Sequence, residues 1–210
     1  MAHDHQTLAF YDKEAAAYAT RSDNIGVPKH IAKFVAEQIT GTAVLDLGCG
    51  TGRDACALID AGLNVTAFDG SAEMAREAEK RIGAPVRVQL FDDLNDIAAF
   101  DGIWANASLL HVPRTGLPNI LARVHRALKP GGLLAASFKS GGQEGRDELG
   151  RYYNYLNADE LTALRHAAGA WSSLDLKEGR GTGYDGTESG WVVAFARKAA
   201  DGAPGRPALN

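Results

Sequence analysis

The sequence predicts an α/β fold in which helices cover both faces of one mostly parallel sheet, a doubly wound arrangement. Strand-length apolar runs alternate with amphipathic segments along residues 43–139, which is the pattern of parallel strands joined by helices. A glycine-rich loop follows the first run, and two further runs near the C-terminal end flank a second glycine-rich connection. We therefore expect a seven-stranded sheet that ends in an antiparallel hairpin.

The apolar runs place each element of this sheet. Five parallel strands are expected at residues 43–47, 64–69, 86–91, 102–105 and 133–139. Helices between them are expected at 53–61, 71–82 and 115–128, and the last has apolar residues three and four apart, which gives it one apolar face. The sequence Lys129-Pro-Gly-Gly should end that helix, and the hairpin strands are expected near 171–177 and 190–197.

The segment before the first strand predicts a helical lid. Two helical patterns occupy 6–20 and 28–39, and the second begins with Pro28, which suits the first turn of a helix. Neither helix has a strand partner, so residues 1–42 are expected to cap the site. We expect one domain over 1–198, with its core at 43–198, and a disordered tail at 199–210, where glycine and proline interrupt a polar segment.

Composition excludes several classes of protein. No apolar run approaches the roughly 20 residues that cross a bilayer, and the start lacks the features of a secretory signal, so we expect a cytoplasmic protein without a membrane partner. Cys49 and Cys56 have no second Cys or His pair beside them, which indicates neither a disulfide framework nor a zinc site. The net charge of −4 argues against a nucleic-acid partner.

The glycine loop at Val44–Asp54 is the strongest functional signal. Its sequence, Val-Leu-Asp-Leu-Gly-Cys-Gly-Thr-Gly-Arg-Asp, places Gly48, Gly50 and Gly52 between a buried strand and a helix that begins near Arg53. Glycine permits a tight turn and a close approach of the backbone to a ligand. The alternative is a turn that uses glycine for packing alone, but the strand–loop–helix context favours a ligand-binding loop.

Two acidic residues indicate which ligand this loop holds. Asp46 lies directly under the loop, where it would repel a pyrophosphate but attract the α-ammonium and sulfonium groups of S-adenosylmethionine. Asp69 ends the second strand, where a carboxylate can accept both ribose hydroxyls, although alone it could be a turn residue. Gly70 leaves room for the ligand, and Ser71 can cap the next helix.

These residues resemble the class I S-adenosylmethionine-dependent methyltransferase family over roughly residues 40–198. The glycine motif is matched by Leu45–Gly52 and the acidic ribose position by Asp69, while Phe100–Pro113 and Leu128–Leu134 are similar to the fourth strand and to the entry of the fifth. The nearest resemblance is to small bacterial type 11/12 and tellurite-resistance-like members. It implies a Rossmann-like fold and use of S-adenosylmethionine, with S-adenosylhomocysteine as product.

The resemblance also implies a set of cofactor contacts. The glycines would line the methionine and ribose, Phe91–Asp93 the adenine edge, and Asn106-Ala107 the methionine side. The acidic residue that the family often carries after the third strand falls on either Leu90 or Asp93, depending on the alignment, and Met74 either touches the adenine or packs in the core. The full predicted set is Asp46, Gly48, Cys49, Gly50, Gly52, Arg53, Asp69, Gly70, Ser71, Met74, Phe91, Asp92, Asp93, Asn106 and Ala107.

Candidate residues for the acceptor side come from three segments. Methyl transfer from a sulfonium can proceed by positioning alone, and His111 is either a general base or a loop histidine bonded to the backbone. The long loop after the fifth strand supplies Lys139, Arg146, Arg151 and Tyr152, which either hold an anionic group or form a solvated charged loop. The N-terminal helix resembles a lid that carries Tyr11, Tyr18 and Arg21, or packs as an ordinary helix.

The expected activity is methyl transfer to an O, N, S or chalcogen atom of a small molecule. Methylation of RNA or protein, and non-catalytic sensing of S-adenosylmethionine, are the alternatives. No metal is expected, because Asp92, Asp93 and Asp96 crowd a loop that the adenine should occupy. The protein is expected to be a monomer or a homodimer.

Overall fold

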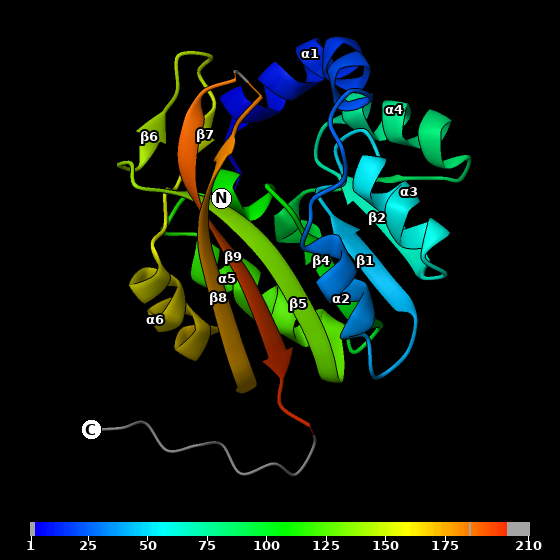
Figure 1. Ribbon diagram of the computed structural model, residues 1–210, viewed down its shortest axis with the longest axis vertical. Helices are drawn as coiled ribbons and strands as arrows, with labels where there is room; N and C mark the ends of the chain where they lie inside the picture. Colours follow the sequence, from blue (N-terminus) through cyan, green and yellow to red (C-terminus); the bar gives the residue numbers. More distant parts are fainter. Residues whose placement is uncertain (1–2, 185, 201–210) are drawn as a thin grey trace.

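The computed structural model describes residues 3–184 and 186–200. Its main sheet has seven strands in the order β3-β2-β1-β4-β5-β9-β8 (Figure 1). Neighbours among β1 to β5 pair parallel, whereas β9 runs antiparallel to both β5 and β8. This confirms the predicted doubly wound fold with a C-terminal hairpin. The strands are β1 Ala43–Leu47, β2 Asn64–Asp69, β3 Arg87–Val88, β4 Phe100–Ala105, β5 Leu128–Ser140, β8 Trp171–Thr182 and β9 Glu188–Lys198.

Helices and a small hairpin surround this sheet. The helices are α1 His5–Ser22, α2 Ile31–Ala36, α3 Arg53–Asp60, α4 Ala72–Ile82, α5 Leu117–Ala127 and α6 Ala158–Ala168, with short 3-10 turns η1 Phe91–Asp93 and η2 Leu109–His111. The small hairpin pairs β6 Gly145–Arg146 with β7 Tyr152–Tyr153.

The core lies on both faces of the central strands. Every residue of β4 is buried, as expected for a parallel strand covered by helices on its two faces. Ile103 belongs to the cluster on the side of α5 and α6, whereas Trp104 packs with Phe34 of α2 on the other side. Packing on both faces fixes the position of β4 and therefore of Asn106 and Ala107, which follow it.

Two elements are shorter than predicted. The helix expected to begin at Pro28 begins at Ile31, because the Pro28 carbonyl accepts a turn hydrogen bond from the Ile31 N–H before the helix starts. This helix packs on the sheet through Phe34 rather than over the site. The strand expected at 86–91 is reduced to Arg87–Val88, both exposed at the sheet edge, after which the chain turns into η1.

Helix α6 was absent from the prediction. Asn157 and Glu160 form a capping box at its start, in which each side chain bonds the other's backbone N–H. The two capping residues are present in the sequence, but a capping box between irregular segments does not by itself specify a helix. The hairpin strands β8 and β9 also extend further than expected, with pairing that continues to Thr182 and Glu188. The predicted disordered tail falls mainly on residues 201–210, which lie outside the described residues.

The carboxyl ends of the parallel strands form one edge of the sheet. From β1 the chain proceeds outward to β2 and β3, whereas β4 and β5 lie on the other side of β1, so a crevice opens at this switch of strand order. Helix α1 lies across that edge (Figure 1). Among the described residues, no helix has the length and apolar character needed to span a membrane.

Shortening a side chain in β4 should destabilise the fold strongly. Ile103 is fully buried at the centre of the sheet, so Ile103→Ala is expected to lower the free energy of unfolding by about 2–5 kcal/mol. Urea denaturation followed by circular dichroism measures this loss. Ile97 is 72% exposed, so Ile97→Ala is the matched control and should change stability by less than about 0.5 kcal/mol. Equal losses in the two variants would contradict this packing.

Candidate functional site

The glycine loop turns sharply between β1 and α3. Gly48 and Gly52 adopt left-handed backbone conformations, with φ of 75° and 78°. A Cβ at Gly48 would lie 2.6 Å from the Cβ of Ser108, and one at Gly52 would lie 3.1 Å from the Cα of Ala78 in α4. Glycine is therefore required both by the backbone conformation and by close packing against the segment after β4 and against α4.

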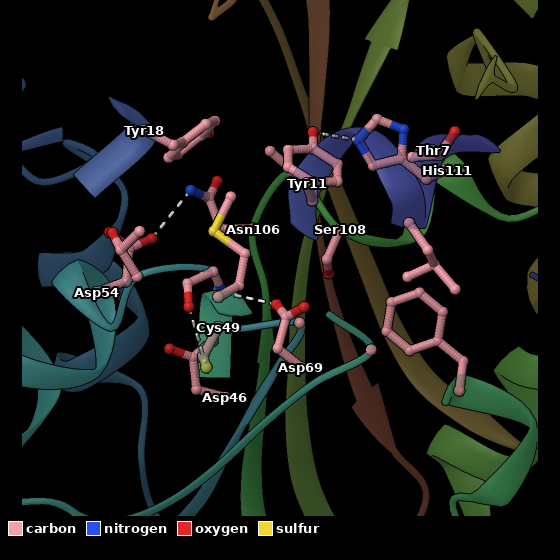
Figure 2. Close-up of a pocket in the computed structure, with 18 of the residues that line it drawn as sticks. Thr7, Tyr11, Tyr18, Asp46, Cys49, Asp54, Asp69, Asn106, Ser108 and His111 are labelled. Atoms are coloured by element: carbon pink, nitrogen blue, oxygen red, sulfur yellow. Dashed lines mark hydrogen bonds between the residues drawn. The ribbon is translucent and has the colours of Figure 1, made fainter. Parts of the chain in front are cut away.

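A cavity lies between this loop and α1 (Figure 2). The space in and around it is about 1080 Å³, a volume that includes open solvent at its mouth. Most of the predicted cofactor and acceptor residues meet there. Those that line the cavity are Tyr11, Tyr18, Asp46, Gly48, Cys49, Gly50, Arg53, Asp69, Gly70, Met74, Phe91, Asn106, Ala107 and His111.

Asp46 contributes an unpaired carboxylate oxygen to the cavity. The residue is 2% exposed, and its Oδ2 has no hydrogen-bond partner among the residues that the structure describes. Burial, together with the nearby Asp54 and Asp69 carboxylates, raises the pKa of Asp46 well above its usual range. A buried oxygen without a donor is costly, and a cationic or hydrogen-bonding ligand would remove that cost.

Asp69 connects the glycine loop to the start of α4. One carboxylate oxygen accepts a hydrogen bond from the Gly50 N–H at 2.8 Å, and the other accepts from the Ser71 N–H at 2.9 Å. Burial raises the pKa of Asp69 to about 6, despite these backbone donors, which lower it. The carboxylate is thus fixed in orientation, and each oxygen retains lone pairs for a ligand hydroxyl.

Asp54 organises the segment that follows β4. Its Oδ2 accepts hydrogen bonds from Trp104 Nε1 and Asn106 Nδ2, both at 3.0 Å, and its Oδ1 accepts from Arg53 Nε at 2.8 Å. Figure 2 shows the Asn106 amide directed at this carboxylate. Asn106 in turn accepts from Ser137 Oγ at 2.7 Å, which settles the orientation of its amide.

The backbone of Ala107 is strained. Its φ of 52° is left-handed, which is uncommon for a residue with a Cβ. Ser137 Oγ accepts the Ala107 N–H at 2.8 Å and so holds this conformation in place. Strain maintained by a hydrogen bond beside a cavity is typical of a ligand-binding segment.

Hydrogen bonds and an ion pair hold helix α1 over the cavity at three points along its length. Near its middle, Asp12 accepts a hydrogen bond from Ser71 Oγ at 2.6 Å, and at its end Ser22 Oγ lies 3.0 Å from Thr51 Oγ1 of the glycine loop. At its start, Asp4 caps the helix and forms an ion pair with Arg146 of the β6–β7 hairpin, with N–O distances of 2.8 and 2.6 Å. The helix therefore bridges the glycine loop and the small hairpin as a lid.

His111 is the last residue of η2 and lines the cavity. Its Nε2 is 2.8 Å from the Tyr11 hydroxyl, and its Nδ1 is 2.6 Å from the Tyr152 carbonyl oxygen. Burial lowers the pKa of His111 to about 4, although the hydrogen bond to the Tyr152 carbonyl raises it. The imidazole is consequently neutral at neutral pH.

The remaining predicted residues do not line the cavity: Arg21, Gly52, Ser71, Asp92, Asp93, Lys139, Arg146, Arg151 and Tyr152. Arg151 is 1% exposed and donates to both oxygens of the Asp147 carboxyl group through its backbone and its guanidinium. Lys139 lies over the ring of Tyr153, and Arg21 over the ring of Tyr184. The charged groups of these three side chains thus contact other residues of the protein.

Several lining residues lie outside the predicted set of contacts: His3, Asp4, Thr7, Leu8, Ser22, Thr51, Asp54, Gln89, Leu90 and Ser108. Thr51 and Asp54 belong to the glycine motif, so their position was a usable signal. His3, Asp4 and Thr7 reach the cavity only because α1 folds across it. Ser108 is 6% exposed, and its hydroxyl has no hydrogen-bond partner among the described residues.

Known proteins resemble this chain in both sequence and fold. A family model described as a methyltransferase domain matches residues 44–132. Malonyl-(acyl-carrier protein) O-methyltransferase of Enterobacter lignolyticus (strain SCF1) is 32% identical over 136 residues, which are 64% of this chain and 45% of that protein. Trans-aconitate 2-methyltransferase of Paracidovorax citrulli (strain AAC00-1) is 33% identical over 144 residues, covering 64% of this chain and 53% of that protein. The chain thus spans about half the length of these two relatives.

A solved structure has a similar fold. It is 1,6-didemethyltoxoflavin-N1-methyltransferase of Burkholderia thailandensis with bound 1,6-didemethyltoxoflavin and S-adenosylhomocysteine, at a TM-score of 0.68 and 24% identity over 95% of this chain and 92% of that one. In its fold, its glycine motif and its matched domain, the chain is similar to class I S-adenosylmethionine-dependent methyltransferases.

Proposed function

We propose that the protein binds S-adenosylmethionine in this cavity and transfers its methyl group to a small molecule. The observation that carries the proposal is the pair of carboxylates, buried Asp46 and half-buried Asp69, at the ends of adjacent strands beside the glycine loop. Asp46 offers an unpaired oxygen to the cationic methionine end, and Asp69 offers two oriented oxygens to the ribose hydroxyls. The cofactor's charge and shape thus suit the residues present.

The chain's contribution to such a reaction is mainly positional. When bound, the cofactor supplies a methyl group on a sulfonium, which is displaced in line by a lone pair of the acceptor. Asp54, Asn106 and Ser137 form a rigid network beside the methionine subsite, so the ligand meets groups that are already oriented. Helix α1 contributes Thr7, Tyr11 and Tyr18 to the wall of the cavity and so shields part of it from solvent.

The names of similar proteins support a small acceptor. Two of these proteins are named after small molecules, trans-aconitate and 1,6-didemethyltoxoflavin. In this chain, Tyr11, Tyr18 and His111 line the part of the cavity under the lid, which leaves an enclosed, partly aromatic subsite for such a molecule. The net charge of −4 provides little attraction for a nucleic-acid backbone.

Calorimetric titration tests the cofactor assignment. The wild-type protein is expected to bind S-adenosylmethionine and S-adenosylhomocysteine with micromolar dissociation constants. Asp69→Ala removes the ribose acceptor and should weaken both ligands by about 1.5–3 kcal/mol. Asp60→Ala, at an exposed position of α3, is the control and should bind as the wild type does. Absence of binding by the wild-type protein would refute the proposed function.

The affinity for the cofactor should depend on pH through Asp69. Its pKa is about 6, above its usual value because of burial, so the carboxyl group is ionised at pH 7 and becomes protonated below pH 6. A protonated carboxyl group loses part of its capacity to accept the ribose hydroxyls. We expect affinity to fall as the pH is lowered through 6, by up to about tenfold per pH unit. In Asp69→Asn this step should disappear, and a step of unchanged size in that variant would contradict the assignment.

A further inference from the structure

Both ring nitrogens of His111 are already engaged, and their partners determine its tautomer. The Tyr152 carbonyl, 2.6 Å from Nδ1, can only accept a hydrogen bond, so Nδ1 carries the proton. The bare Nε2 must then accept, and the Tyr11 hydroxyl donates to it at 2.8 Å. His111 is therefore a neutral proton acceptor whose single accepting atom faces the hydroxyl of the lid.

Tyr11 is the group through which the cavity reaches this acceptor. It comes from α1, lines the cavity, and directs its hydroxyl toward His111 in Figure 2. A tyrosine oxygen has two lone pairs beside its O–H, and Arg151 hydrogen-bonds to this one. The remaining lone pair can accept a donor from a molecule in the cavity, while the O–H still points at Nε2.

The surrounding contacts hold this chain of hydrogen bonds in register. Arg151 is anchored by Asp147 at 2.7 Å, and the Tyr152 N–H donates to Thr7 Oγ1 of α1 at 2.8 Å. The lid thus bonds to the same residue, Tyr152, whose carbonyl sets the tautomer of His111. The hydrogen-bond chain is complete only when α1 lies over the site.

A proton acceptor of this kind assists a hydroxyl group more than it assists the other methyl acceptors. A hydroxyl oxygen that has received a methyl group is strongly acidic until it loses its proton, so even a weakly basic imidazole can remove that proton as the bond forms. A carboxylate has no proton to lose. A neutral amine is nucleophilic without a base, and a thiol ionises more readily than a hydroxyl group does.

We infer that the acceptor presents a hydroxyl group and that Tyr11 relays its proton to His111. This inference rests on the proposed function and names the reacting group for it. The acceptor oxygen forms the new C–O bond with its lone pair, and the C–S bonding pair returns to sulfur. The hydroxyl proton moves to the Tyr11 oxygen as the Tyr11 proton moves to Nε2. The resulting imidazolium releases its proton to solvent when the lid opens.

Four benzene derivatives that differ only in their methyl-accepting group test which group reacts. Phenol, aniline, thiophenol and benzoate are each incubated with the protein and S-adenosylmethionine, and the methylated products are measured after subtraction of the rate without protein. Phenol is expected to be methylated fastest. A faster reaction of aniline, thiophenol or benzoate would overturn the inference.

Matched variants test the relay. Tyr11→Phe and His111→Gln should each slow phenol methylation by about 100-fold or more, and the double variant should be no slower than the slower single variant, because the two residues act in one path. Tyr184→Phe is the control. Its ring stacks on Tyr18 outside the cavity, so losing its hydroxyl should change the rate by a factor of about two at most. A wild-type rate in Tyr11→Phe would overturn the relay.

The tautomer of His111 and its link to the acceptor can also be measured without turnover. In ¹⁵N NMR of histidine-labelled protein, His111 should appear as the neutral Nδ1–H tautomer. Phenol added to the complex with S-adenosylhomocysteine should shift its Nε2 signal in the wild type but not in Tyr11→Phe. If phenol is neither methylated nor shifts this signal, the inference fails.

Calorimetry separates this failure from failure of the proposed function. If wild-type protein binds S-adenosylmethionine while the phenol experiments fail, only the hydroxyl relay is refuted. If it does not bind the cofactor, both are refuted.

Discussion

A carboxylate at the end of β2 joins the parts of the site. Asp69 accepts hydrogen bonds from Gly50 in the glycine loop and from Ser71 at the start of α4. Ser71 in turn donates to Asp12 of the lid helix. The Asp69 side chain therefore connects the loop to the helix, and Ser71 connects both to the lid, at the carboxyl end of β2.

The local parts of the site were predictable, whereas its long-range parts were not. Asp46, the glycines and Asp69 lie within short segments whose strand, loop and helix signals are adjacent in sequence, so their meeting follows from the order of parallel strands. Arg146 looked like a ligand for an anion. The structure instead gives it Asp4 as a partner, a pairing far apart in sequence that depends on where α1 docks.

The same limit applies to the fold. The central strands carry continuous apolar runs and were located within a few residues, because burial on both faces imposes that composition. Helix α6 and the short β3 have mixed composition, and their extent depends on which neighbours cover them. Arg151 is the clearest case, since a buried guanidinium is compatible with the fold only because Asp147 lies beside it.

The attachment of α1 also has a consequence for the order in which the chain matures. Its partners Ser71, His111, Arg146 and Tyr152 all follow it in the chain. During synthesis the first helix emerges long before the surface that receives it exists, and contacts between such distant segments form late because closing long loops is entropically costly. The docking of α1 is thus expected to be the last step in building the cavity, so a nascent chain cannot hold ligand until the small hairpin has been made.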